Sequence, residues 1–200
     1  MQLYATKLSH FSRKVRILLD HYELNYEFID VGNVADRDSN TFNNNPLMNV
    51  PVLTDGGLWL IDSDNIAAYI VRKHDPEDKY RVLTNCIDVL NANSVLNGVM
   101  SNEVKIILAE RMGLDTKPIA YFQKAQAVIK NGLSWLEDNT ILFSPSEPGY
   151  LDFHLISLWD HLSYYEITEL SYSRLKSIAE ELGANINIAK TAPHILKPKS

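Results

Sequence analysis

The first part of the chain combines two short β-rich runs with one helical repeat. Residues 2–5 predict a short strand, and residues 26–30 alternate polar and apolar side chains as a second strand does. Between them, apolar residues from Val15 to Tyr22 recur on one helix face, while charged residues occupy the other. We expect Ser12 to be the N-cap of this helix. The order predicts a right-handed crossover between parallel strands.

A hairpin and a second helix are predicted next. Residues 31–49 are polar and predict a loop with one short helix near residues 38–45. Residues 51–54 and 58–61 flank an Asp-Gly-Gly turn, where positive φ angles are tolerated, so they predict a hairpin. Apolar spacing predicts a helix from about 63 to 74. Strand–helix–strand followed by strand–strand–helix is the order of a thioredoxin-like domain.

The pattern becomes purely helical after a polar linker at residues 75–78, whose proline stops the preceding helix. Apolar positions then predict helices around residues 83–108, 122–136, 151–162 and 175–182, the last capped by Gly183. The third is apolar on most sides, as in a central helix. Residues 184–200 lack periodicity, so two alternatives stay open for this tail: that it packs against the domain, or that it is mobile. We predict an α/β thioredoxin-like domain at 1–75 and an all-helical domain at 80–200.

Composition narrows the function classes. The 200-residue chain is 46% hydrophobic and has a formal net charge of -6, which argues against a broad basic nucleic-acid-binding face. No stretch approaches the roughly 18 apolar residues of a membrane span, and we see no signal peptide, so we expect a cytoplasmic protein. The only cysteine, Cys86, excludes an internal disulfide. We expect it to be a small buried side chain.

Four segments carry the strongest functional signal: Ser9–Ile17, Asn45–Leu53, Asp62–Ile70 and Gly149–Asp152. In this order and spacing they resemble cytosolic glutathione transferases of the serine type, such as the zeta, tau and phi classes and bacterial relatives. The similarity runs from residue 1 to about 182. It implies a glutathione-binding thioredoxin-like domain followed by a helical domain that carries the electrophile site and dimer contacts.

The resemblance makes Ser9 the catalytic residue, whose hydroxyl would donate to the glutathione sulfur. Stabilising a thiolate of ordinary pKa about 8.5 at neutral pH takes a shift of about two units, roughly 2.7 kcal/mol. A hydroxyl donor at the positive end of a helix can supply it. Ser9 and Ser12 stand where redox relatives carry Cys-x-x-Cys, which excludes a mixed disulfide here. The alternative is that both are merely turn and capping serines.

The remaining binding residues are also implied by the resemblance. Val50, before a cis Pro51, would offer its backbone to the cysteinyl part of glutathione. Asp62, where relatives have Glu, would meet the γ-glutamyl ammonium, and Ser63 its carboxylate. The alternatives are a trans proline at an edge strand and simple capping roles. Asn49 would hold the glycyl carboxylate with one hydrogen bond and no charge.

Several further residues have weaker assignments. Phe11 would line the glutathione and electrophile site between the two domains. Lys7, Arg13 and Lys14 are candidates for a compensating positive charge, although a solvated surface role is the simpler interpretation.

The histidines and one capping motif have structural interpretations. We expect His10 to be a partly exposed turn residue, although it could tune the site. His154 and His161 lack carboxylates at metal-ligand spacing, so a core or surface role is favoured and no metal is expected. Gly149-x-x-Asp152 is interpreted as a structural capping box.

The predicted function is a detoxifying glutathione S-transferase that conjugates glutathione to a small hydrophobic electrophile. Glutathione is a co-substrate, and no cofactor is expected. Relatives imply a homodimer, without nucleic-acid or membrane partners. Two alternatives stay open: a non-catalytic binding protein on the same fold, or another glutathione-dependent activity such as an isomerase, dehalogenase or peroxidase.

Overall fold

The computed structural model describes residues 1–197; residues 198–200, the end of the predicted second domain, lie outside the described residues. A four-stranded sheet has the order β2-β1-β3-β4. Its strands are β1 (Gln2–Ala5), β2 (Glu27–Asp30), β3 (Val52–Asp55) and β4 (Leu58–Ile61). β1 is parallel to β2 and antiparallel to β3, with Leu3 opposite Phe28 and Leu53. The predicted crossover and hairpin are therefore confirmed.

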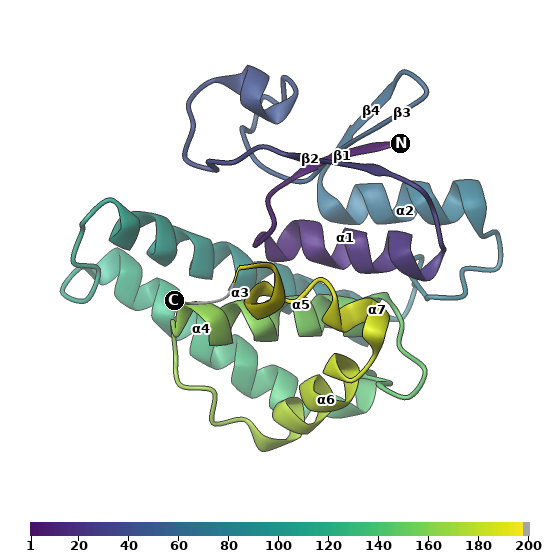
Figure 1. The fold of residues 1–200 in the computed structure, drawn as a ribbon. Coiled ribbons are helices and arrows are strands. Elements are labelled where there is room, and N and C mark those ends of the chain that lie inside the picture. Colours follow the sequence, from purple (N-terminus) through teal and green to yellow (C-terminus); the bar gives the residue numbers. More distant parts are fainter. Residues whose placement is uncertain (198–200) are drawn as a thin grey trace.

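Two helices cover the side of the sheet that faces the rest of the molecule (Figure 1). They are α1 (His10–His21) and α2 (Ser63–His74), and a short 3₁₀ helix, η1 (Ser39–Phe42), lies in the loop before the hairpin. Val15, Leu18 and Leu19 of α1 and Ile66 of α2 are completely buried. These are the apolar faces that the sequence predicts, and burying them fixes both helices against the sheet.

The second half is helical, as predicted. It comprises α3 (Ile87–Arg111), α4 (Ala120–Asp138), η2 (Thr140–Leu142), α5 (Tyr150–Tyr165), α6 (Ser173–Gly183), α7 (Ile186–Ala189) and α8 (Pro193–Leu196). α5 is buried along most of its length and packs against both α1 and α3. The C-terminal segment left open by the sequence packs through α7 and α8 against α1 and α5. Between residues 1 and 197, no helix is long and apolar enough to cross a membrane.

Three local expectations are wrong. α1 begins three residues earlier than expected, because Ser9 rather than Ser12 caps it, and Ser12 is buried in the first turn. Cys86 is exposed at the start of α3 instead of buried. Gly183 is the last residue of α6, and the C-cap is Ala184. Ser9 caps α1 because its side chain accepts from the Ser12 N–H, and Cys86 is exposed because the buried face of α3 begins only at Ala92.

Arg13 and Lys14 correct a further expectation, since both are buried where α1 meets the helical half. The Arg13 guanidinium lies 2.8 Å from the Asp160 carboxylate and also donates to the Ile156 carbonyl at 3.0 Å. Lys14 Nζ lies 2.6 Å from Asp64 Oδ1, and burial lowers the pKa of Lys14. Because their charges are used inside the protein, neither residue is available to a ligand carboxylate.

The capping box at the start of α5 is confirmed. Asp152 Oδ2 accepts from the Gly149 N–H at 2.9 Å, and Oδ1 accepts from the Ser144 N–H at 2.8 Å. A Cβ at position 149 would lie 2.9 Å from the Tyr80 carbonyl oxygen. Glycine therefore stands at this cap because the linker backbone passes too close for a side chain.

Candidate active site

One cleft brings all the predicted site residues together. It has a volume of about 640 Å³ and lies where the carboxyl end of β1, the 47–51 loop and the start of α2 face α3 and α5. Its lining includes Ser9, Phe11, Asn49, Val50, Pro51, Asp62 and Ser63. Lys7, on the β1–α1 turn, also reaches it. The predicted site residues, from three separate sequence segments, thus share one cavity.

Ser9 is positioned by the first turn of α1. Its Oγ accepts hydrogen bonds from the Ser12 N–H at 3.2 Å and from the Ser12 hydroxyl at 3.1 Å. A hydroxyl oxygen has two lone pairs, so these two donors leave the Ser9 hydrogen free to point at a third group. Ser9 also sits at the positive end of the α1 dipole. The geometry suits stabilisation of an anionic atom in the cleft.

The 45–51 loop presents backbone and amide groups on the opposite wall. The Val50–Pro51 peptide bond is cis, as the resemblance implies. The Asn45 amide donates to the Asn49 carbonyl at 2.9 Å and to Asn49 Oδ1 at 2.8 Å. These bonds hold Asn49 in place and occupy its oxygen, so the Asn49 NH₂ group is the part available to donate a hydrogen bond to an anionic ligand.

Asp62 and Ser63 form the start of α2. Asp62 has a positive φ of 73°, and its Oδ1 accepts from the backbone N–H groups of Asp64 at 3.0 Å and Asn65 at 3.1 Å. Asp62 is exposed, and Ser63 is buried beside it. Capping and ligand binding are therefore compatible here, because one carboxylate oxygen does the capping and the other stays available.

A cluster of buried polar side chains that the sequence did not predict lies next to Ser9. His10 is buried rather than partly exposed, and its ring stacks on that of His161 with centroids 4.1 Å apart. Glu103, also buried, lies 2.6 Å from His161 Nδ1 and 3.3 Å from His10 Nε2. Burial and the neighbouring His161 lower the pKa of His10 to about 4. Burial alone would raise the pKa of Glu103, but its contacts with His10 and His161 hold it below the ordinary value.

The donor atoms of these three residues lie within 4.8 Å of one another, a spacing that a metal ion could use. The hydrogen bonding does not favour one. The Phe11 N–H donates to His10 Nδ1 at 2.9 Å, which places the proton of the neutral ring on Nε2, the nitrogen facing Glu103. A ligating histidine instead donates from its second nitrogen. The cluster is thus a carboxylate that contacts His161 Nδ1 at 2.6 Å and faces His10 Nε2 at 3.3 Å.

Sequence spacing gave one partial sign of this cluster, the seven-residue interval that places His154 and His161 on one face of α5. His154 lies instead where α1 meets the helical half, and its Nε2 is 3.3 Å from Lys14 Nζ. Glu103 is 58 residues from His161 along the chain, so only the packing of α3 against α5 identifies it.

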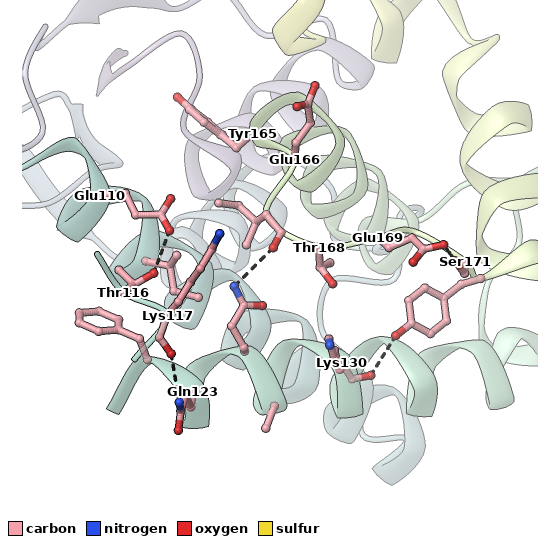
Figure 2. A pocket seen from close by; sticks show the side chains of 16 residues that line it. Glu110, Thr116, Lys117, Gln123, Lys130, Tyr165, Glu166, Thr168, Glu169 and Ser171 are labelled. Atoms are coloured by element: carbon pink, nitrogen blue, oxygen red, sulfur yellow. Dashed lines mark hydrogen bonds between the residues drawn. The ribbon is translucent and has the colours of Figure 1, made fainter. Parts of the chain in front are cut away.

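A second hollow, of about 870 Å³, lies between α4 and the segment joining α5 to α6 (Figure 2). Its polar groups are largely satisfied internally: Thr116 donates to Glu110 at 2.8 Å, and the Gln123 amide donates to the Lys117 carbonyl at 3.0 Å. None of the predicted site residues lines it. The cleft at Ser9 is the candidate site.

Comparison with known proteins shows which domain family and which solved structures the chain resembles. Residues 3–78 match the family described as "Glutathione S-transferase, N-terminal domain". No curated protein sequence matches the chain.

Among solved structures, a glutathione S-transferase from Methylobacterium radiotolerans, in complex with glutathione sulfonate, has a TM-score of 0.78 and 20% identity over 96% of this chain and 94% of its own. One from Methylobacillus flagellatus, with glutathione bound, has a TM-score of 0.79 and 18% identity over 96% and 98%. A bacterial maleyl pyruvate isomerase of the zeta class covers 100% of both chains at 18% identity and a TM-score of 0.75.

At these identities the structural likeness establishes the fold alone, and the family match concerns residues 3–78. Residues 3–78 thus match the N-terminal domain family of glutathione S-transferases, and the described length of the chain has the fold of the solved glutathione S-transferases that it resembles.

Proposed function

We propose that this protein binds glutathione in the Ser9 cleft and transfers it, as a thiolate, to a hydrophobic electrophile. The observation that carries the proposal is the hydrogen bonding of Ser9. Both lone pairs of its oxygen accept from Ser12, so its own hydroxyl hydrogen is free for the ligand sulfur. Together with the α1 dipole, this donor favours the thiolate over the thiol.

The other groups in the cleft match the polar ends of glutathione. Asp62 supplies a carboxylate for the γ-glutamyl ammonium, and the start of α2 at Ser63 supplies N–H groups for its carboxylate. Val50, next to the cis bond, offers backbone hydrogen bonds to the cysteinyl unit. The Asn49 amide remains for the glycyl carboxylate. Lys7, also in the cleft, is the candidate for an additional positive charge.

The electrophile would bind on the other side of the sulfur, toward the helical half. Phe11 and the side chains Val104, Ile107 and Leu108 of α3 supply apolar lining there. This surface favours a small hydrophobic molecule and does not define it further.

The proposal is tested by calorimetric titration with glutathione and by turnover of a generic aryl halide. Ser9→Ala should lower turnover at least tenfold while the glutathione Kd changes less than threefold, because the hydroxyl acts on the sulfur rather than on the peptide. Ser94→Ala, which removes an exposed serine of α3 outside the cleft lining, is the matched control, and it should retain full turnover. Unchanged turnover in Ser9→Ala would remove Ser9 from the reaction, and a folded protein that binds no glutathione would favour the non-catalytic alternative.

We propose further that residues 1–75 and 80–200 are the glutathione-binding and electrophile-binding domains of a cytoplasmic detoxifying homodimer. Large apolar side chains are exposed on β4 (Leu58, Trp59) and on α3 (Ile87, Leu90), and their exposure favours cover by a second copy. Light scattering should give about twice the 22.7 kDa of one chain. A mass of one chain would refute the dimer.

A further inference from the structure

His161 is a titratable side chain in the cleft that the thiolate-stabilising role of Ser9 does not use. It lies on α5, lines the cleft, and stacks on His10, the residue that follows Ser9. Its side chain is 7% exposed, so it is close to the cleft surface and largely shielded from bulk water.

Glu103 fixes the orientation of His161. The 2.6 Å contact between Glu103 Oε1 and His161 Nδ1 places a proton on Nδ1 and leaves Nε2 as the nitrogen that can act on a molecule in the cleft. Glu103 is itself completely buried on α3 and is also faced by His10 from α1. A carboxylate that orients an imidazole beside a binding site is the arrangement used in general acid–base catalysis.

The groups beyond His161 suit a reaction in which negative charge develops on the electrophile. The Tyr165 ring contacts the His161 ring with centroids 4.6 Å apart. Arg111 donates to the Tyr165 hydroxyl at 2.6 Å, and both residues line the cleft. A phenol hydroxyl and a guanidinium there can stabilise an oxyanion.

We propose that His161 is an acid–base catalyst for thiol addition to conjugated carbonyl compounds, with Glu103 as its positioning residue. The inference rests on the proposed function, because it requires glutathione at Ser9. His161 Nε2 takes the proton that the glutathione thiol loses, and the thiolate sulfur forms a bond to the β-carbon. The C=C electron pair moves toward the carbonyl oxygen, near Arg111, to give an enolate.

The proton then returns from His161 Nε2 to the α-carbon. The enolate electron pair forms the new C–H bond, the carbonyl is restored, and the imidazole is neutral again. Glutathione and the alkene combine into one adduct with nothing left over. Substitution at an aryl halide differs, because the halide leaves as an anion and no carbon needs a proton. The acid step of His161 is therefore specific to conjugate addition.

The experiment compares two substrates, an α,β-unsaturated ketone and an aryl halide, in the full-length protein. His161→Asn keeps a donor for Glu103 and removes Nε2. We expect its kcat for addition to fall at least thirtyfold, because return of a proton to the α-carbon needs the positioned imidazole. Its kcat for substitution should fall less than fivefold, because Ser9 still stabilises the thiolate and the thiol proton can leave to solvent. Its glutathione Kd should stay within threefold. Glu103→Gln should move the ratio of the two activities in the same direction by at least fivefold. His154→Asn, which alters another buried histidine of α5 outside the cleft lining, should leave the ratio unchanged.

The outcomes separate the two proposals. An equal fall of both activities in His161→Asn, or no fall in either, would overturn the role of His161 while leaving glutathione transfer intact. If His161→Asn failed to fold, a Glu103→Gln ratio equal to that of the unmodified protein would overturn the inference. Absence of glutathione binding in the unmodified protein would overturn the proposed function itself, and the inference with it.

Discussion

Helices α1 and α5 begin with side chains that accept hydrogen bonds, in contrasting surroundings. At α5, both oxygens of the buried Asp152 accept backbone N–H groups, from Gly149 and Ser144. At α1, Ser9 accepts two bonds from Ser12 and keeps its own hydrogen for the cleft. A helix start becomes a candidate site only where hydrogen-bonding capacity remains and a cavity adjoins it.

The largest effect is expected at the start of α5, which Asp152 caps. Asp152→Ala should lower the free energy of unfolding by about 3 kcal/mol, because two backbone donors lose their acceptor in a buried environment. Urea unfolding measures the change, and activity per folded molecule should be unaltered. Asp152→Asn keeps one acceptor oxygen and should lose less. A loss below about 1 kcal/mol in the alanine variant would show that water replaces the carboxylate.

The next effect concerns pH and the buried His10 beside Ser9. Its pKa lies at about 4 in the folded protein against 6.5 ordinarily, so between these values the unfolded chain binds the extra proton. Stability is therefore complete above pH 6.5 and is lost as the pH falls toward 4, by about 2 kcal/mol between pH 7 and pH 5.

Urea unfolding at the two pH values measures this dependence. His10→Asn should remove the part due to His10, while the part due to His154, whose pKa burial also lowers, stays. A variant with the full pH dependence would assign the effect to other groups.

The Asp62→Asn variant tests whether helix capping and ligand binding can be separated at the start of α2. Asp62→Asn keeps the capping oxygen and tolerates the positive φ, so stability should change by less than about 1 kcal/mol. Glutathione affinity should fall about tenfold, equal to about 1.4 kcal/mol, because the charge facing the ammonium is gone. Titration calorimetry measures the Kd. A stability loss with unchanged affinity would make Asp62 a cap alone.

The smallest effect is expected at Asn49, which brings no charge. Asn49→Ala should weaken glutathione binding about threefold, or about 0.6 kcal/mol, since one hydrogen bond to a carboxylate is lost at an exposed position, where water replaces it. Asn49→Lys should strengthen binding at low salt and lose the gain at high salt. An Asn49→Lys protein with the original affinity would place the glycyl carboxylate elsewhere.

Much of the fold could be predicted because its elements have local causes. The strands at 2–5 and 58–61 and the helix at 63–74 lie where alternation, turn residues and helical spacing predict them. Ser9, Val50 and Asp62 were identifiable from motifs, and the structure gathers them in one cleft. Their roles remain predictions, which the experiments above address.

The amino-acid sequence by itself determined the order of elements, the family resemblance and the absence of cysteine at positions 9 and 12. Only the tertiary structure decided that His10, Arg13 and Lys14 are buried, that Cys86 is exposed, and that Glu103 meets His161. The physical reason is the distance along the chain over which each effect acts. Periodicity and capping act within one or two turns, whereas the burial of a charge depends on partners that packing brings from 50 to 150 residues away.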